Sequence, residues 1–186
     1  GDRIDIKYYI PGEILSCSVL KLMLQPLIEN SIFHGFGNLK RKGLIKVNAR
    51  REDHDLILIV SDNGNGMDSQ KLDEVRKTLE QSEYVKPTQK VGLYNVHQRI
   101  RLEFGNRYGL EIESILKSGT RVEIRLPYRN IQDIEDAGDA RGLKEIDGVV
   151  GMKYMGNKED IEHMEGMEKT NDVAEVEVLN DKSVDS

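Results

Sequence analysis

Apolar and polar residues follow regular spacings along the first 130 residues, and these spacings predict strands and helices. Apolar residues alternate with polar ones over residues 4–10, which predicts a half-buried strand. From Val19 to Phe36 they recur three and four positions apart, which predicts a helical segment. Pro26 lies within that segment, so we expect a short turn before it and a main helix that begins at or just before it.

The rest of this region predicts two hairpins and two more helices. The predicted elements are strands at 44–50, 55–60, 110–116 and 121–126 and helices at 68–83 and 92–104, with a loop at 84–91. The polar stretch 51–54 joins the first two strands, and the turn 117–120 joins the last two. The amino-acid composition changes after Asn130 to an acidic, Gly- and Met-rich sequence, so we predict one domain at 1–130 followed by an extension at 131–186.

Charge separates the two parts more sharply than the overall balance of −6 suggests. Residues 131–186 carry 16 acidic and 6 basic side chains and one aromatic residue, Tyr154, so we predict an acidic and largely disordered extension. The alternatives are that Val173, Val176 and Val178 add a strand to the domain, or that the tail covers a basic surface. Residues 1–130 carry 17 acidic and 21 basic side chains, an excess too weak to predict nucleic-acid binding.

Three further features bear on where the protein works. Cys17 is the single cysteine, which excludes an internal disulfide and fits a reducing compartment. The chain has no apolar run long enough to span a bilayer and no signal peptide. It begins at Gly1 without an initiator methionine, so we expect a fragment of a longer protein.

The stretch SDNGNGMD, residues 61–68, leaves an unbroken apolar run through one carboxylate and two glycines. Asp62 stands where the strand ends, and a half-buried carboxylate needs a partner. Gly64 and Gly66 allow a positive φ or a close backbone approach. An EF-hand would need oxygen ligands at both glycines, and a dinucleotide-binding fingerprint would need glycine at Ser69. No Walker-type phosphate loop occurs, and a tight connection without a ligand is the alternative.

The stretch LQPLIENSIFHG, residues 24–35, places polar side chains on an otherwise apolar helix. Asn30 and His34 are four positions apart and would share one face of an α-helix. One interpretation is a buried asparagine that bonds a neighbouring backbone group. The other is a magnesium ligand, because an amide oxygen suits a hard cation shared with phosphate oxygens, with His34 donating to those phosphates.

Two weaker features follow in chain order. Gly92 in KVGLYNVHQRI opens a helix behind a flexible loop, and the free amides at a helix N-terminus bind phosphate. An ordinary helix start is the alternative. Gly119-Thr120 in SGTRVEIRLP precedes an alternating strand and taken alone is a hairpin turn.

In this order the four stretches resemble the N, G1, G2 and G3 boxes of the ATP-binding catalytic domain of sensor histidine kinases. That domain belongs to a superfamily shared with gyrase, heat-shock chaperone and mismatch-repair ATPases. LQPLIENSIFHG and VGLYNVHQRI are most similar to the LytS/YesM-type subgroup, and the resemblance covers residues 2–128. It implies an α+β, two-layer Bergerat-type sandwich, in which a mixed, mostly antiparallel sheet carries helices on one face. ATP would lie between the Asn30 helix and a mobile lid at 84–91.

The resemblance implies a role for each residue around the base. The carboxylate of Asp62 would accept a hydrogen bond from the exocyclic amine of adenine. Gly64 and Gly66 would let the backbone pass close to the base. Thr120 would contact adenine through water, and Met67 belongs to the same set.

For the phosphates the resemblance implies that Asn30 holds Mg²⁺. The other implied nucleotide contacts are His34, Lys90, Gly92, Leu93 and Asn95. Glu29 could polarise the incoming imidazole, and a solvated helix residue is the alternative. Two positions depart from the pattern, because Phe33 stands where many histidine kinases have lysine, and only Gly92 remains of an often glycine-richer box.

The implied activity is transfer of the γ-phosphoryl of Mg-ATP to a histidine on a separate dimerisation domain, and from there to a response regulator. None of the four histidines has the surroundings of a phosphoacceptor, so we expect that domain upstream in a longer protein. The full-length protein would be a membrane-anchored bacterial homodimer with this domain in the cytoplasm. The alternatives are an anti-sigma-type serine kinase of the same fold and a non-catalytic ATP-sensing module.

Overall fold

A computed structural model describes residues 4–20, 22–37, 41–81, 91–130, 149–151 and 175–178. The larger sheet has the strand order β5-β6-β4-β3-β1-β8. Its strands are β1 (Ile4–Tyr9), β3 (Gly43–Glu52), β4 (Asp55–Asp62), β5 (Gly109–Ile115), β6 (Gly119–Pro127) and β8 (Glu175–Val178). A smaller sheet pairs β2 (Ser18–Leu20) with β7 (Val149–Gly151).

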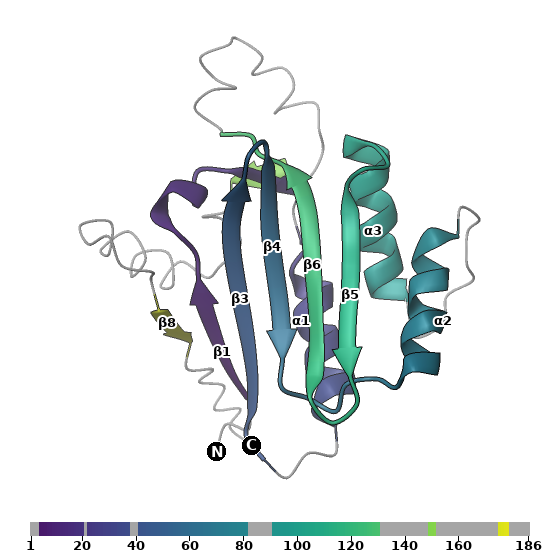
Figure 1. Cartoon of the computed structure of the whole chain (residues 1–186). Coiled ribbons are helices and arrows are strands. Elements are labelled where there is room, and N and C mark those ends of the chain that lie inside the picture. The colour runs from purple at the N-terminus through teal and green to yellow at the C-terminus, as the bar shows by residue number, and fades with distance from the viewer. Residues whose placement is uncertain are drawn as a thin grey trace, which may run out of the picture.

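The helices lie on one face of the larger sheet (Figure 1). They are the 3₁₀ turn η1 (Gly12–Ile14), α1 (Gln25–Asn30), α2 (Ser69–Glu80) and α3 (Val91–Phe104). A wider π-type turn, η2 (Ser31–Gly35), continues α1. Strand β1 runs parallel to β3, whereas the other neighbours are antiparallel. The predicted two-layer α+β sandwich with a mixed, mostly antiparallel sheet is therefore confirmed.

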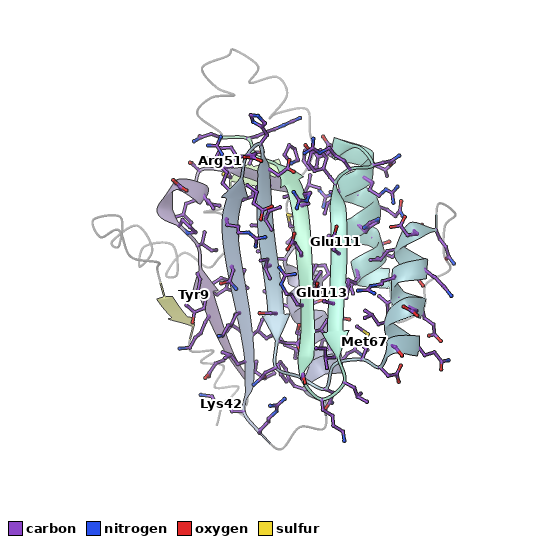
Figure 2. All side chains as sticks on the ribbon, in the orientation of Figure 1. Tyr9, Lys42, Arg51, Met67, Glu111 and Glu113 are labelled. Carbon is purple, nitrogen blue, oxygen red and sulfur yellow. The ribbon has the colours of Figure 1, made fainter. Side chains whose placement is uncertain are left out.

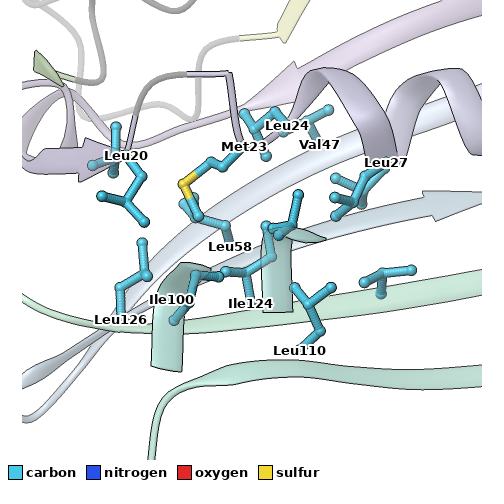
Figure 3. Close-up of a cluster of buried hydrophobic side chains, with 14 of the residues drawn as sticks. Leu20, Met23, Leu24, Leu27, Val47, Leu58, Ile100, Leu110, Ile124 and Leu126 are labelled. Atoms are coloured by element: carbon cyan, nitrogen blue, oxygen red, sulfur yellow. The ribbon is translucent and has the colours of Figure 1, made fainter. Parts of the chain in front are cut away.

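Alternation along the strands builds the core between the sheet and the helices. In β4, Leu56, Leu58 and Val60 point to the helical layer and are buried. The inward residues of β6 and β5 extend the same surface, and α1 and α3 cover it with their own apolar residues (Figure 3). The labelled residues of this core are Leu20, Met23, Leu24, Leu27, Val47, Leu58, Ile100, Leu110, Ile124 and Leu126.

The face of the sheet opposite the helices carries many charged side chains, among them the labelled Glu111 and Glu113 (Figure 2). Asp55 is the most buried of them and accepts from Arg107 and Arg125 at 2.9 to 3.0 Å. Burial by itself would raise the pKa of Asp55, but hydrogen bonds from the two guanidinium groups outweigh it and lower that pKa.

Helix α3 is joined to β5 through a buried histidine. The Nδ1 atom of His97 accepts the backbone N–H of Leu110 at 3.0 Å, and Nε2 lies 3.3 Å from a guanidinium nitrogen of Arg101. Burial and the neighbouring Arg101 charge lower the pKa of His97. The neutral imidazole therefore holds the edge strand against the helix.

The structure corrects one prediction and shifts several boundaries by one to three residues. Val19 and Leu20 belong to strand β2 and not to a helix. Their helical spacing is misleading, because both side chains are completely or almost completely buried and a fully buried short strand shows no alternation. The main helix begins at Gln25, directly before Pro26, as predicted.

The predictions for the loop 84–91 and the tail 131–186 fall mostly outside the described residues. Within the tail, β7 pairs with β2 and β8 pairs with β1. No helix among the described residues is long and apolar enough to cross a membrane.

Candidate functional site

Asp62 is the last residue of β4, and its carboxylate bonds residues of η2, of the loop after β4 and of β6. Its Oδ2 atom accepts the hydroxyl of Ser31, in η2, at 2.9 Å. Its Oδ1 atom accepts the backbone N–H of Gly64 at 2.8 Å and that of Thr120, in β6, at 3.2 Å. A carboxylate offers about four lone-pair positions, so three protein donors leave one position, on Oδ2, for a ligand.

The loop after Asp62 is pressed between η2 and the tip of the β5–β6 hairpin. A Cβ atom on Gly64 would lie 2.6 Å from the backbone of Gly35. Gly66 has a φ of +60°, and a Cβ atom there would lie 2.0 Å from the carbonyl oxygen of Ile115. Both predicted glycines are required by the packing of backbone against backbone. The backbone of Asn65 bonds both η2 and the hairpin: its N–H donates to the carbonyl oxygen of Gly35 at 2.8 Å, and its carbonyl oxygen accepts the N–H of Lys117 at 2.6 Å.

Ser114 joins this loop to the hairpin from inside the sheet. Its hydroxyl oxygen accepts the backbone N–H of Met67 at 2.8 Å. The same oxygen lies 3.0 Å from the carbonyl oxygen of Gly119 and 2.9 Å from the hydroxyl of Thr120. Met67 therefore reaches the site through its backbone, while its side chain packs against the core.

Arg41 holds the outer side of the same loop. Its guanidinium donates to the carbonyl oxygen of Asn63 and lies 3.5 Å from that of Gly64. The side chain of Asn63 in turn accepts the backbone N–H of Leu44 at 2.8 Å. The Asp62 loop is thus tied to η2, to the hairpin and to the start of β3.

The predicted polar residues of the Asn30 helix lie at its open side. Glu29 is exposed and accepts from Gln25 at 2.8 Å. Asn30 is half-buried, and its side chain makes no hydrogen bond with any residue that the structure describes. His34 is exposed, as is Phe33 beside it.

Asn30 and His34, for which a shared helical face is predicted, lie on α1 and on its π-type continuation. Asn30 is the last residue of α1, and His34 lies in the π-type turn that follows. A spacing of four residues is close to one full turn in both geometries, so the shared face of Asn30 and His34 stays a prediction.

The start of α3 faces the start of α1. A Cβ atom on the exposed Gly92 would lie 3.4 Å from Cβ of Pro26, so the two helix starts touch there. Leu93 is a core residue, which leaves only its backbone for contact with a ligand, whereas Asn95 is exposed. Lys90 lies outside the described residues.

Sequence reasoning missed Ser31, Ser114 and Arg41, although two of them leave a signal. Ser31 is a further polar residue in the apolar helix, directly after Asn30. Ser114 continues the inward positions of Leu110 and Ile112, where a third apolar residue would be expected. Arg41 leaves no such signal, because nothing in its neighbourhood along the chain distinguishes it from a surface arginine.

The assembled site offers the carboxylate of Asp62 as an acceptor, which three donors hold in place. Polar groups at the end of α1 and at the start of α3 lie beside it. The described residues contain no group of three or more His, Cys, Asp or Glu side chains that could hold a metal ion. A cation here would depend on Asn30 and on oxygens that a ligand brings. Fold and site together define an α+β sandwich whose polar site lies at one end of the sheet.

Comparison with known proteins identifies the family. Residues 18–130 match the family described as histidine kinase-, DNA gyrase B-, and HSP90-like ATPase, and the chain belongs to it. Sensor histidine kinase YesM of Bacillus subtilis (strain 168) is 34% identical over 129 residues, which are 69% of this chain and 20% of YesM. Sensor protein LytS of Oceanobacillus iheyensis is 32% identical over 134 residues, which are 72% of this chain and 22% of LytS.

These matches confirm the resemblance to the LytS/YesM-type subgroup. The chain spans about a fifth of the length of the curated relatives that it matches. The solved structure of the mycobacterial sensor histidine kinase MprB overlaps 69% of this chain and 85% of that chain, with a TM-score of 0.46 and 18% identity. Membership in the family rests on the sequence matches and not on this distant likeness.

Proposed function

We propose that this chain is the ATP-binding catalytic domain of a sensor histidine kinase, which passes the γ-phosphoryl of Mg-ATP to a histidine on a separate dimerisation domain. The observation that carries the proposal is the Asp62 carboxylate, which three protein donors hold in place with one acceptor position left over. An ionised acceptor matches the amine of adenine and repels the carbonyl oxygen of guanine.

The remaining base contacts come from the backbone and from the hairpin. Gly64 and Gly66 let the loop pack against the backbone of Gly35 and Ile115, and the loop backbone would then pass close to the base. Thr120 donates its backbone N–H to Asp62, and its hydroxyl would contact the base directly or through water. The backbone of Met67 is held nearby by Ser114.

Asn30 fits the role of magnesium ligand in this structure. Its amide is half-exposed and free of hydrogen bonds to described residues, unlike that of a buried structural asparagine. Mg²⁺ is commonly held by one or two protein oxygens together with phosphate oxygens and waters, and when bound it neutralises phosphate charge. Backbone N–H groups of Gly92 and Leu93, with Lys90 and the exposed His34 and Asn95, would complete the phosphate contacts.

The transfer itself asks this domain mainly for positioning and charge stabilisation. The acceptor imidazole forms a P–N bond as the bond between the γ-phosphorus and the β–γ bridging oxygen breaks, which yields phosphohistidine and ADP. Glu29 is exposed beside Asn30 and could accept the imidazole N–H, which would polarise the ring.

The acceptor histidine would belong to another domain. His97 is only 4% exposed, and its two ring nitrogens face Leu110 and Arg101, so it is a structural residue. His34 and His54 are exposed, and His163 lies outside the described residues. The proposed partners are therefore a histidine-bearing dimerisation domain, a response regulator that takes the phosphoryl group onward, and a second copy in a membrane-associated homodimer.

Two measurements test this function. Calorimetric titration of the chain should show tighter ATP binding with Mg²⁺ than with chelator, and poor GTP binding. With γ-³²P-ATP the chain alone should stay unlabelled, yet should label a supplied histidine-bearing domain from its own protein in an acid-labile form. Acid-stable label on a serine would favour the anti-sigma-type kinase, and ATP binding with no transfer to any supplied domain would favour a sensing module.

A further inference from the structure

We infer that Ser114 fixes the direction of the Thr120 hydroxyl, and that the hydroxyls of Thr120 and Ser31 consequently offer the base lone pairs and no protons. Ser114 is not among the residues predicted to contact the nucleotide, so it would act as a positioning residue for base selection. The inference rests on the proposed function, because it concerns how that site distinguishes one base from another.

A count of protons around Ser114 assigns the direction. A serine hydroxyl has one proton to donate and two lone pairs to accept with. The N–H of Met67 can only donate, and it takes one lone pair. The carbonyl oxygen of Gly119, at 3.0 Å, can only accept, so that contact is a hydrogen bond only if Ser114 donates its proton there.

The contact with Thr120, at 2.9 Å, then has a single possible direction. Since the proton of Ser114 is given to Gly119, Thr120 must donate to the second lone pair of Ser114. In the reverse arrangement Ser114 would donate to Thr120, and two lone-pair-bearing oxygens would face each other at Gly119. One arrangement alone satisfies all three contacts of the Ser114 hydroxyl, and it leaves Thr120 without a proton for a ligand.

The same reasoning applies to Ser31, on the other side of the carboxylate. Its hydroxyl lies 2.9 Å from Oδ2 of Asp62, which has no proton when ionised, so Ser31 donates. Ser31 bonds this carboxylate through its hydroxyl and Thr120 bonds it through its backbone N–H, and the hydroxyl protons of both residues are therefore in use. A base whose amine contacts these oxygens directly finds acceptors, whereas a carbonyl in the same place finds no hydroxyl donor.

The test compares ATP with inosine triphosphate, which has a carbonyl in place of the adenine amine and lacks the extra amino group of guanine. Dissociation constants of both are measured by calorimetry for the unmodified chain, for Ser114→Ala and for Ser118→Ala. Ser118 is exposed in the same hairpin turn, which makes it a matched control. In Ser114→Ala the Thr120 proton is released and can turn toward a carbonyl, so the preference for ATP over inosine triphosphate should fall about tenfold, roughly one hydrogen bond.

Ser118→Ala should keep the preference of the unmodified chain. An unchanged preference in a folded Ser114→Ala protein that merely melts earlier would show that Ser114 is structural, and would overturn the inference. If the unmodified chain bound neither nucleotide, the proposed function itself would fail, which is a different result.

Thr120→Val gives a second test that does not depend on the folding of Ser114→Ala. Valine has nearly the shape of threonine and removes only the hydroxyl. If that hydroxyl is an acceptor, its loss weakens ATP more than inosine triphosphate, and the preference for ATP falls. If it is a donor, its loss weakens inosine triphosphate more, and a rise in the preference would overturn the inference.

Discussion

Replacing Asp62 with asparagine separates recognition of the base from support of the fold. The amide oxygen of Asp62→Asn can still accept the N–H groups of Gly64 and Thr120, which Oδ1 accepts now. The amide nitrogen takes the place of Oδ2, and the Ser31 hydroxyl, 2.9 Å away, can rotate and accept from it. The three internal hydrogen bonds survive with one reversed, so the melting temperature should change little.

The loss falls on the position left for the ligand. In the unmodified chain that position is a carboxylate lone pair, and in the variant it is an N–H that meets the adenine amine donor to donor. A hydrogen bond to a charged group contributes about 1.5–3 kcal/mol, so the affinity for ATP and for ADP should fall by roughly ten- to a hundredfold or slightly more. Inosine triphosphate should lose less or should gain, because its carbonyl can accept from the new N–H.

Calorimetric titration of ATP, ADP and inosine triphosphate, with a thermal melt of each protein, measures both effects. Asp62→Ala is the contrasting variant, because it leaves the three donors without an acceptor and should also lower the free energy of unfolding by about 3 kcal/mol, near 1 kcal/mol for each bond. The reasoning is refuted if Asp62→Asn binds ATP as tightly as the unmodified chain. It is equally refuted if the variant weakens ATP and inosine triphosphate by the same factor.

Three further predictions concern the metal, the pH dependence and the loop. Asn30→Ala should spare the binding of metal-free ATP and remove the gain that Mg²⁺ provides, whereas an early melt with the Mg²⁺ dependence intact would defeat the metal assignment. His97 has a lowered pKa in the fold, so below about pH 6.5 the unfolded chain binds a proton that the folded chain does not. The free energy of unfolding should therefore decrease as the pH is lowered through this range. Denaturant midpoints between pH 7.5 and 5 should show that fall, and His97→Gln should flatten it. Gly66→Ala should lower the melting temperature and weaken ATP binding, since φ is +60° and the new Cβ atom would meet Ile115; a melt identical to that of the unmodified chain would contradict the packing of this loop.

Local spacing was sufficient for most of the fold. Alternation with period two marks β1, β3, β5 and β6, because neighbours along a strand point to opposite faces whatever the strand pairs with, whereas β4 is marked by an unbroken apolar run. Pro26 marks the start of α1 because a proline lacks the N–H that a helix interior needs. Spacing failed at Val19 and Leu20, where burial on every side leaves no polar position to reveal the period.

The sequence by itself determined which residue types could serve the site: a carboxylate at a strand end, glycines that allow close approach and polar groups on an apolar helix. Only the tertiary structure decided their partners. Ser31 and Asp62 are 31 positions apart, and Thr120 follows Asp62 by 58, yet one carboxylate bonds both. Contacts of this kind depend on how β4, β6 and η2 pack, and strand order leaves no trace in local spacing. The direction of a hydroxyl proton is set in the same way, because it follows from every partner around the oxygen and not from the residue that carries it.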